Sequence, residues 1–410
     1  MAASRSTLND LKEQLLAWPL AISLLSISGY HYLQSILKSF HIRRLLGSYA
    51  SASPPPFSSH YFLPITTLSY TEKHEISPKN IDSYIHKLLP KLSKSAILSN
   101  PQARKLFNQI LSSSSFSSIT HDPKNLLVGL YPVIINTPPL PPDLSNFSNT
   151  SNTTLSVIVP CYNESLPSLC ETLTANLQRT SAPSLVEVVI VDAGGHSPNF
   201  EATIKAAIGE LCAVSFVAHR KGGGRGPAQN AGAQYASSPL LSFLHADTLL
   251  PLSWDTKIIK TLMKPGVSSC AFNFGIAPSG GDSGEVPGIR AIAVTANLRT
   301  RLYDLPYGDQ CLSISKQMFE YVGGFPNNCL MEDYDLIAVL RMRARVRRGV
   351  EKLEIIEGDP VLCSPRRWEK LGVLLTTFTN SSIVNSYARG IDPDKLYKEY
   401  YGQEPPPKLI

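Results

Sequence analysis

Acidic side chains follow three short apolar runs of this 410-residue chain. Glu164 ends the stretch LSVIVPCYNE, Asp192 follows VEVVIV, and Asp247 comes three residues after LLSFL. Short β-branched runs that end in polar residues are typical of buried strands followed by loops. Because open α/β sheets bind nucleotides outside the carboxyl ends of their strands, these three carboxylates are predicted to share one rim. The alternative is that Asp192 and Glu164 only cap the helices that follow.

A glycine-rich stretch stands between the second and third of these runs. Gly222, Gly223 and Gly224 precede Arg225, with Gln229 and Asn230 further along. Glycines let backbone approach a ligand closely, and the guanidinium fork of arginine donates two hydrogen bonds to a phosphate. The other interpretation is a flexible surface turn.

Composition limits the possible classes of partner. Hydrophobic residues make up 43% of the chain, enough for a large core and for two or three domains. Residues 1–150 hold 13 Lys and Arg against 7 Asp and Glu, whereas residues 151–410 hold 25 of each. No basic stripe with interleaved aromatic residues is present, so nucleic acid is not an expected partner. The seven cysteines form no Cys-x-x-Cys pair and indicate buried, reduced thiols.

The first 154 residues differ in character from the rest. Residues 15–37 carry no Lys, Arg, Asp or Glu over 23 positions, which is long enough for a membrane anchor. Basic residues just after this segment would place the following domain on the cytosolic side. An organelle-targeting sequence and a helix that lies on a membrane or packs on the protein are the alternatives. We expect an anchor or targeting segment over 1–45, a helical region over 46–135 and a Pro/Ser/Asn-rich linker over 136–154.

The rest of the chain resembles a known family. The blocks SVIVPCYNE, VVIVDAG, GRGPAQNAGAQYA, LLSFLHADTLLP, PYGDQCLSISKQMFEYVGGFP, MEDYDL and SPRRWEKLGVLLTT occur in the order seen in family 2 glycosyltransferases. They are most similar to a bacterial-type subgroup with GDQ, MED and RRWE blocks. The resemblance covers about residues 155–401 and rests on the ordered set, because a triplet such as His-Ala-Asp alone occurs by chance. The family usually has Asp-Gly-Gly-Ser-x-Asp at Asp192, and the second acid is absent here.

The resemblance implies roles on the donor side. The turn with Pro160, Tyr162 and Glu164 would lie along the nucleoside, and Asp192 would bond the pyrimidine edge. Asp247 would bind the divalent cation that bridges the diphosphate, Mn²⁺ or Mg²⁺, since such hard ions prefer oxygen ligands. His245 replaces the usual first Asp and would favour manganese if it ligates, or else it packs in the core. The donor-binding prediction comprises Pro160, Tyr162, Glu164, Asp192, Arg225, Gln229 and Asn230, and the metal prediction Asp247 and His245.

The resemblance also implies a catalytic and an acceptor side. Asp333, beside Glu332, resembles the general base of inverting members, although acids at a helix start are favourable in any case. Gly308, Asp309 and Gln310 resemble the wall of the acceptor side. Arg367 and Trp368 belong to a basic-aromatic block whose tryptophan either stacks on a sugar or packs in the core.

These observations predict an α/β fold: a mostly parallel central sheet with helices on both faces, of the nucleotide-diphospho-sugar transferase type, over residues 155–402, after a small helical N-terminal region. The expected function is metal-dependent inverting transfer of a hexose from a UDP- or GDP-sugar to an acceptor hydroxyl, at a membrane. A non-catalytic nucleotide-sugar-binding or scaffold protein on the same fold is the alternative.

Overall fold

The computed structural model describes residues 15–30, 32–33, 153–194, 198–219, 222–278, 286–322, 324–326, 328–346, 351–388 and 391–406. The predicted helical region 46–135, and the linker 136–154 except its last two residues, lie outside them.

The described residues contain one seven-stranded sheet, in the order β3-β2-β1-β4-β6-β5-β7. The strands are β1 (Leu155–Cys161), β2 (Val186–Asp192), β3 (Ala213–Ala218), β4 (Leu240–Phe243), β5 (Val267–Ile276), β6 (Ser313–Ser315) and β7 (Lys352–Cys363). Strand β6 runs antiparallel to β4 and β5, and the other pairings are parallel. The predicted mostly parallel sheet is therefore confirmed.

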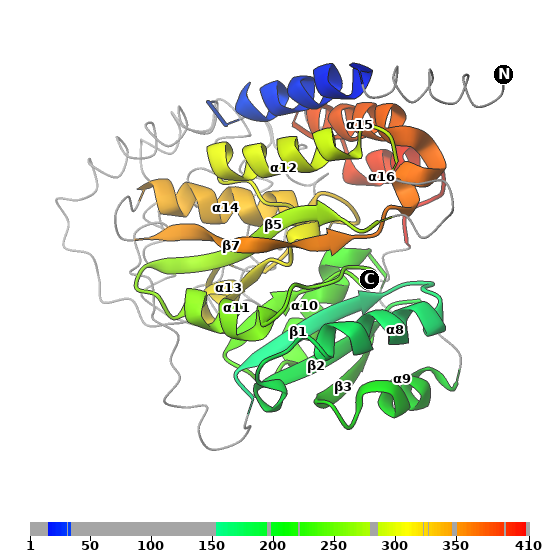
Figure 1. Ribbon diagram of the computed structural model, residues 1–410, viewed down its shortest axis with the longest axis vertical. Helices are drawn as coiled ribbons and strands as arrows, with labels where there is room; N and C mark the ends of the chain where they lie inside the picture. The colour runs from blue at the N-terminus through cyan, green and yellow to red at the C-terminus, as the bar shows by residue number, and fades with distance from the viewer. Residues whose placement is uncertain are drawn as a thin grey trace, which may run out of the picture.

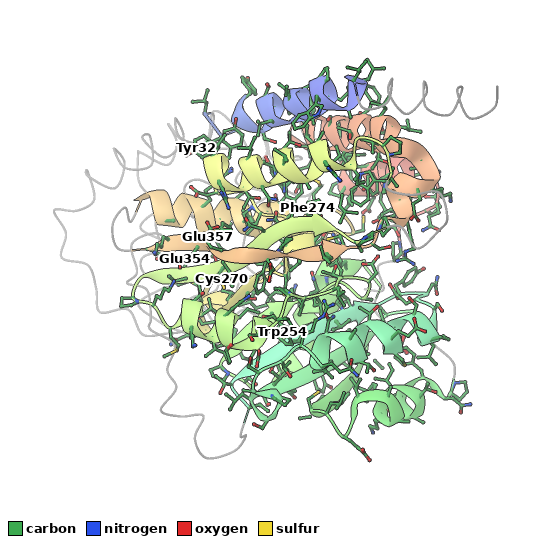
Figure 2. The ribbon with its side chains drawn as sticks, in the orientation of Figure 1. Tyr32, Trp254, Cys270, Phe274, Glu354 and Glu357 are labelled. Atoms are coloured by element: carbon green, nitrogen blue, oxygen red, sulfur yellow. The ribbon has the colours of Figure 1, made fainter. Side chains whose placement is uncertain are left out.

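Helices cover both faces of this sheet (Figure 1). They are α8 (Leu166–Leu177), α9 (Phe200–Ile208), α10 (Arg225–Tyr235), α11 (Trp254–Leu262), α12 (Ile289–Tyr303), α13 (Lys316–Val322), α14 (Glu332–Val346), α15 (Arg366–Ala388) and α16 (Pro393–Tyr401). Because side chains alternate along a strand, Val157 and Val159 of β1 join a core with α8, α9 and α11, whereas Ile158 joins a core with α10, α13 and α14. Trp254, which Figure 2 labels, is 1% exposed in the first core.

Helix α10 lies close against the sheet because of a glycine. A side chain at Gly232 would place its Cβ 2.5 Å from Ile158 and 2.7 Å from Val191, closer than carbon atoms pack. The glycine thus lets the helix that begins at Arg225 approach β1 and β2. The position of Arg225 relative to the sheet rim follows from this contact.

Residues 15–30 and 32–33 form a helix, here called the N-terminal helix, that lies along α12 (Figure 1). Ala17 packs with Ile289 of α12 and Val373 of α15. Near the other end, the ring of Tyr32 is 5.2 Å from that of Tyr303 (Figure 2). The described part of the predicted anchor thus packs on the domain. Among the described helices, none has both the length and the apolar character that a membrane crossing requires.

Helix α15 contains a break at Gly372, whose φ is 75°. All seven cysteines are free thiols, as predicted, and five of them are buried.

Candidate functional site

The carboxyl ends of β1, β2 and β4 form one rim. The three strands are adjacent and parallel, and Asp192 is the register partner of Cys161, three residues before Glu164. Glu164 accepts a hydrogen bond from the backbone N–H of Tyr162. Asp192 accepts one from the N–H of Gly194 at 3.1 Å. The predicted meeting of these strand ends is confirmed, and both carboxylates also order the turns in which they stand.

Backbone strain is concentrated beside the predicted motifs. Asn163, Cys311 and Met331 have φ of 59°, 54° and 65°, a left-handed region that residues with a side chain rarely adopt. They adjoin the turn of Glu164, the Gly-Asp-Gln block and the start of α14. Strained backbone tends to persist where a binding or reacting group must be held in place.

The glycine-rich stretch turns sharply into α10. Gly222, Gly223 and Gly224 have φ of 67°, 82° and 91°. A Cβ at Gly224 would lie 2.6 Å from the Cα of Cys329, and one at Gly226 would lie 3.0 Å from the Cβ of Glu332. The glycines therefore admit the loop before α14 to the start of α10.

Arg225 and Glu332 form an ion pair at this junction. Arg225 Nε donates to Glu332 Oε1 at 2.5 Å, and the side chains are 32% and 1% exposed. Burial raises the pKa of Glu332 against the opposing effect of Arg225. Burial alone would lower the pKa of Arg225. The negative charges of Glu332 and Asp333 outweigh this effect and raise the pKa above its ordinary value, so the guanidinium stays charged. A permanent cation thus lies beside the rim with a third of its surface open.

Asp333 is oriented by backbone groups. Its Oδ2 accepts a hydrogen bond from the N–H of Gly308 at 2.7 Å, and its Oδ1 accepts one from the N–H of Tyr334 at 2.8 Å. A Cβ at Gly308 would lie 3.1 Å from this Oδ2 and 3.3 Å from Nε2 of His245. The structure therefore brings together the Gly-Asp-Gln block, Asp333 and the His-Ala-Asp triplet.

His245 is a neutral group in this cluster. Its Nε2 is buried and has no hydrogen-bond partner within the described part of the chain. Burial, and to a lesser extent the positive charge of Arg225, lower the pKa of His245 well below its usual range. A neutral imidazole with an unsatisfied nitrogen is a ready hydrogen-bond partner or ligand for a bound group.

Asp247 is the open carboxylate of the rim. Its Oδ2 lies 2.6 Å from Nη2 of Arg366, and the side chains are 40% and 68% exposed. Within the described residues, no cluster of three or more His, Cys, Asp and Glu side chains is arranged to hold a metal ion. One exposed carboxylate and the unsatisfied nitrogen of His245 fit a cation that takes its other ligands from phosphate and water.

A third acid lies deeper, beside a small cavity. The cavity, of about 70 Å³, is lined by Asp309, Tyr307 and Trp368 together with α12, α15 and the N-terminal helix. Oδ1 of Asp309, the Tyr307 hydroxyl and Trp368 Nε1 have no partner among the described residues. Burial raises the pKa of Asp309 to about 6, although Arg299 opposes the shift. Unsatisfied donors and an acid beside a cavity are suited to a hydroxyl-bearing ligand.

Other predicted residues have structural partners. Gln310 is fully buried, accepts from Arg299 at 3.1 Å and donates to the carbonyl of Phe272 at 2.8 Å. Asn230 donates to the carbonyl of Phe325 and accepts from its N–H, at 2.8 and 2.9 Å. These amides hold loops in place. Pro160 at the end of β1 and buried Gln229 on α10 stand near the rim without such bonds described.

The basic-aromatic block lies between the cavity and the C-terminal helix. The guanidinium of Arg367 is 3.6 Å from the ring centre of Tyr400, and its Nη2 donates to the Tyr400 carbonyl at 3.2 Å. Trp368 packs 6.4 Å from Phe274, which Figure 2 labels, and also lines the cavity. Trp368 thus serves packing, and its indole N–H has no partner among the described residues.

Sequence reasoning missed part of the site. Arg299, buried on α12, stacks 3.5 Å from the ring centre of Tyr307 and bonds Gln310. It stands in the stretch 273–304, whose sequence contains none of the family blocks. Arg366 could have been identified as the first residue of the Arg-Arg-Trp block. Its pairing with Asp247 could not, because the two residues are 119 positions apart. The signal for Tyr307 was its place directly before the Gly-Asp-Gln block.

Comparisons with known proteins agree with this arrangement. Residues 156–320 match the family described as Glycosyl transferase family 2. No curated protein sequence matches the chain.

Three solved structures that match the chain are distant in sequence. A mannosyltransferase from Pyrobaculum calidifontis, in complex with GDP-Man and Mn²⁺, is 17% identical, with 66% of this chain and 73% of that chain covered and a TM-score of 0.41. GalNAc-T7 with UDP, GalNAc and Mn²⁺ is 15% identical, with 53% and 44% covered and a TM-score of 0.39. TarS residues 1–349 from S. aureus are 13% identical, with 61% and 71% covered and a TM-score of 0.37.

The family match covers β1 to α13, the part of the chain that holds the rim, the glycine-rich turn and the Gly-Asp-Gln block. Residues 156–320 are thus similar to family 2 glycosyltransferases.

Proposed function

We propose that this transferase moves a sugar from a nucleoside diphosphate to an acceptor hydroxyl, with inversion at the anomeric carbon and with a divalent cation as cofactor. Asp333 carries the proposal. Its carboxylate is held by two backbone N–H groups, lies beside Gly308 and His245, and remains partly exposed. A general base must reach the hydroxyl that it deprotonates, and a fixed, accessible carboxylate meets that condition.

The donor would lie along the rim. The turns of Glu164 and Asp192 would contact the nucleoside, and Arg225 would face the diphosphate. Arg225 remains charged and one third exposed while its Nε is occupied by Glu332. Glu332 therefore acts as a positioning residue for Arg225.

The cation would be held by Asp247, with His245 as a second candidate ligand. When bound, a divalent ion neutralises the charge that develops on the leaving diphosphate. Arg366 now pairs with Asp247 through an exposed contact, and such contacts are weak enough to be exchanged. Released from Asp247, Arg366 would be free to contact a phosphate, because its fork suits that group.

The acceptor would approach from the side of Asp309 and the cavity. Its hydroxyl oxygen attacks the anomeric carbon while the bond from that carbon to the diphosphate oxygen breaks. The hydroxyl proton passes to Asp333, and the diphosphate leaves with the electron pair. No covalent intermediate with the protein forms. His245 stays neutral beside Asp333, so it does not compete for that proton.

The test uses the purified full chain with a panel of UDP- and GDP-sugars, with Mn²⁺, with Mg²⁺ and with a chelator. Hydrolysis or transfer is expected for at least one donor, only with metal. Asp333→Asn is expected to lower turnover roughly 100- to 10,000-fold, the usual contribution of a general base. Nucleotide binding, measured by calorimetry, should be unchanged.

The matched control is Asp359→Asn, an exposed carboxylate on β7, which should keep full turnover. Full turnover of Asp333→Asn would remove this residue from the mechanism. Metal-independent turnover would contradict the proposed cation and its ligand Asp247, but not the role of Asp333. Retention of anomeric configuration, read by nuclear magnetic resonance of the product, would refute the inverting mechanism.

A further inference from the structure

Large apolar side chains stay exposed on three helices at one end of the molecule. The N-terminal helix, α12 and α15 lie together there (Figure 1). These helices hold 12 of the 19 exposed large apolar side chains of the described residues. Examples are Trp18 and Ile22 on the N-terminal helix, Leu298 on α12, and Leu375 and Phe378 on α15, exposed by 40–62%. We call this group of helices the apolar end.

The exposed residues form stripes along their helices. Val294, Leu298 and Leu302 follow one another at intervals of four residues on α12, and Phe378 is three residues after Leu375 on α15. Such residues share one side of a helix. The opposite side is buried: Ala17 and Ala21 of the N-terminal helix are 0% exposed. Each helix thus packs on the domain with one apolar side and exposes a second apolar side to solvent. Exposed apolar patches of this kind mark interaction surfaces.

Charge indicates the kind of partner. The three helices carry six Lys and Arg, of which Arg299 is buried and Arg367 stacks on Tyr400, and a single acid, the exposed Glu369. Arg290, Arg301 and Lys370 are exposed among them. Arg301 pairs with Glu357, which Figure 2 labels on β7. A surface that is both apolar and basic is complementary to anionic lipid headgroups above an acyl layer.

We propose that the apolar end docks on an anionic lipid surface. A second copy of the chain fits less well, because a symmetric contact would oppose two basic surfaces. The undescribed residues 34–152 also fit less well, since they hold 11 basic and 5 acidic residues and repel the same surface. The same three helices line the cavity beside Asp309, so docking brings the acceptor side to the level of the headgroups.

The test is flotation of the full chain with vesicles of phosphatidylcholine alone and of phosphatidylcholine mixed with phosphatidylserine. The wild-type chain should float with the mixed vesicles and much less with the neutral ones. The combined variant Leu298→Ser, Leu375→Ser and Phe378→Ser should lower the partition coefficient at least about tenfold, because three apolar side chains no longer enter the interface. Arg290→Gln with Lys370→Gln should lower it by about fivefold for each charge, with mixed vesicles only.

The matched control is Leu211→Ser, Leu252→Ser and Met263→Ser, which removes three apolar side chains exposed by 39–65% away from the apolar end. It should bind like the wild type. The proposal is overturned if the wild-type chain floats with neither vesicle, or if both triple variants lose binding equally. A concentration-dependent dimer that only the first triple variant abolishes, seen by analytical ultracentrifugation, would instead assign this end to a second copy. Nucleotide-sugar turnover in solution is a separate readout, so failure of docking and failure of the proposed transfer are distinguishable.

Discussion

The two ion pairs of the site differ in what surrounds them. Arg225 and Glu332 are 2.5 Å apart, and the carboxylate is 1% exposed. Arg366 and Asp247 are also close, at 2.6 Å, but both side chains are at least 40% exposed. Removing one member of a buried pair leaves an uncompensated charge, whereas an exposed pair can open into water at little cost.

This difference separates fixed from exchangeable parts of the site. Glu332 stands at the start of α14, directly before Asp333, so its bond to Arg225 ties the start of α10 to the loop before the proposed base. Asp247 holds only a surface arginine. The buried pair thus keeps the geometry, and the exposed pair can release a carboxylate to a cation.

The largest expected effect is the loss of the buried pair. Glu332→Ala should lower the free energy of unfolding by about 3 kcal/mol, at the lower end for buried pairs because Arg225 is partly exposed. Urea denaturation followed by circular dichroism measures it. Asp247→Ala, the matched change in the exposed pair, should cost less than about 1 kcal/mol. Equal costs for the two variants would show that burial does not distinguish the pairs.

The double variant Arg225→Met with Glu332→Leu sharpens the same comparison. Replacing both members of a buried pair by apolar residues of similar size is often neutral. The double variant should therefore recover most of the stability lost in Glu332→Ala, while nucleotide binding stays impaired because the cation is absent. Recovery of nucleotide binding together with stability would remove Arg225 from the donor site.

The strand ends could be predicted from sequence because local pattern and topology agree there. Apolar runs before Glu164, Asp192 and Asp247 indicate buried strands, and in the structure these strands are neighbours. The role of Asp333 rests instead on the resemblance of its Met-Glu-Asp block to the family, and it stays a prediction. The pairing of Arg225 with Glu332 was not predicted, because it joins residues 107 positions apart.

Roles that depend on long-range hydrogen bonds could not be predicted either. An amide such as Gln310 or Asn230 looks the same in sequence whether it binds a ligand or a backbone carbonyl. The N-terminal helix is similar: its lack of charge left an anchor, a targeting sequence and a helix packed on the protein open, and in the structure Ala17 and Ala21 are buried against the domain. Two alanines four residues apart were the available signal for that packing.

Asp309 gives a further prediction, since it is a partly buried acid whose Oδ1 has no partner among the described residues. Its pKa is about 6 in the folded protein against an ordinary 3.8, so the folded state binds this proton more tightly than the unfolded chain. The stabilisation is complete below about pH 4 and is lost as the pH rises through about 6. Asp309→Asn should match the wild type at pH 4 and exceed its stability by about 2 kcal/mol at pH 7, after a discount for solvent screening.

Urea denaturation between pH 4 and pH 8 measures this difference. The control Asp359→Asn, at an exposed position, should differ from the wild type by the same small amount at every pH. A pH-independent difference for Asp309→Asn would mean that a partner, such as Arg299, neutralises this acid in the folded protein.

The smallest expected effect concerns the exposed pair and the cation. Arg366→Ala removes the only cation that is described on Asp247, so Mn²⁺ no longer displaces an arginine when it binds. An exposed pair is worth at most about 1 kcal/mol, so Mn²⁺ affinity without nucleotide should rise up to about fivefold. Calorimetric titration of Mn²⁺ measures it, and Lys370→Ala, one turn further along α15, is the control. If Arg366 contacts the diphosphate, the same variant should weaken nucleotide binding in the presence of Mn²⁺. Unchanged Mn²⁺ affinity would show that the ion binds away from Asp247. The Arg225–Glu332 and Arg366–Asp247 pairs would then differ in burial but not in whether they exchange with a cation.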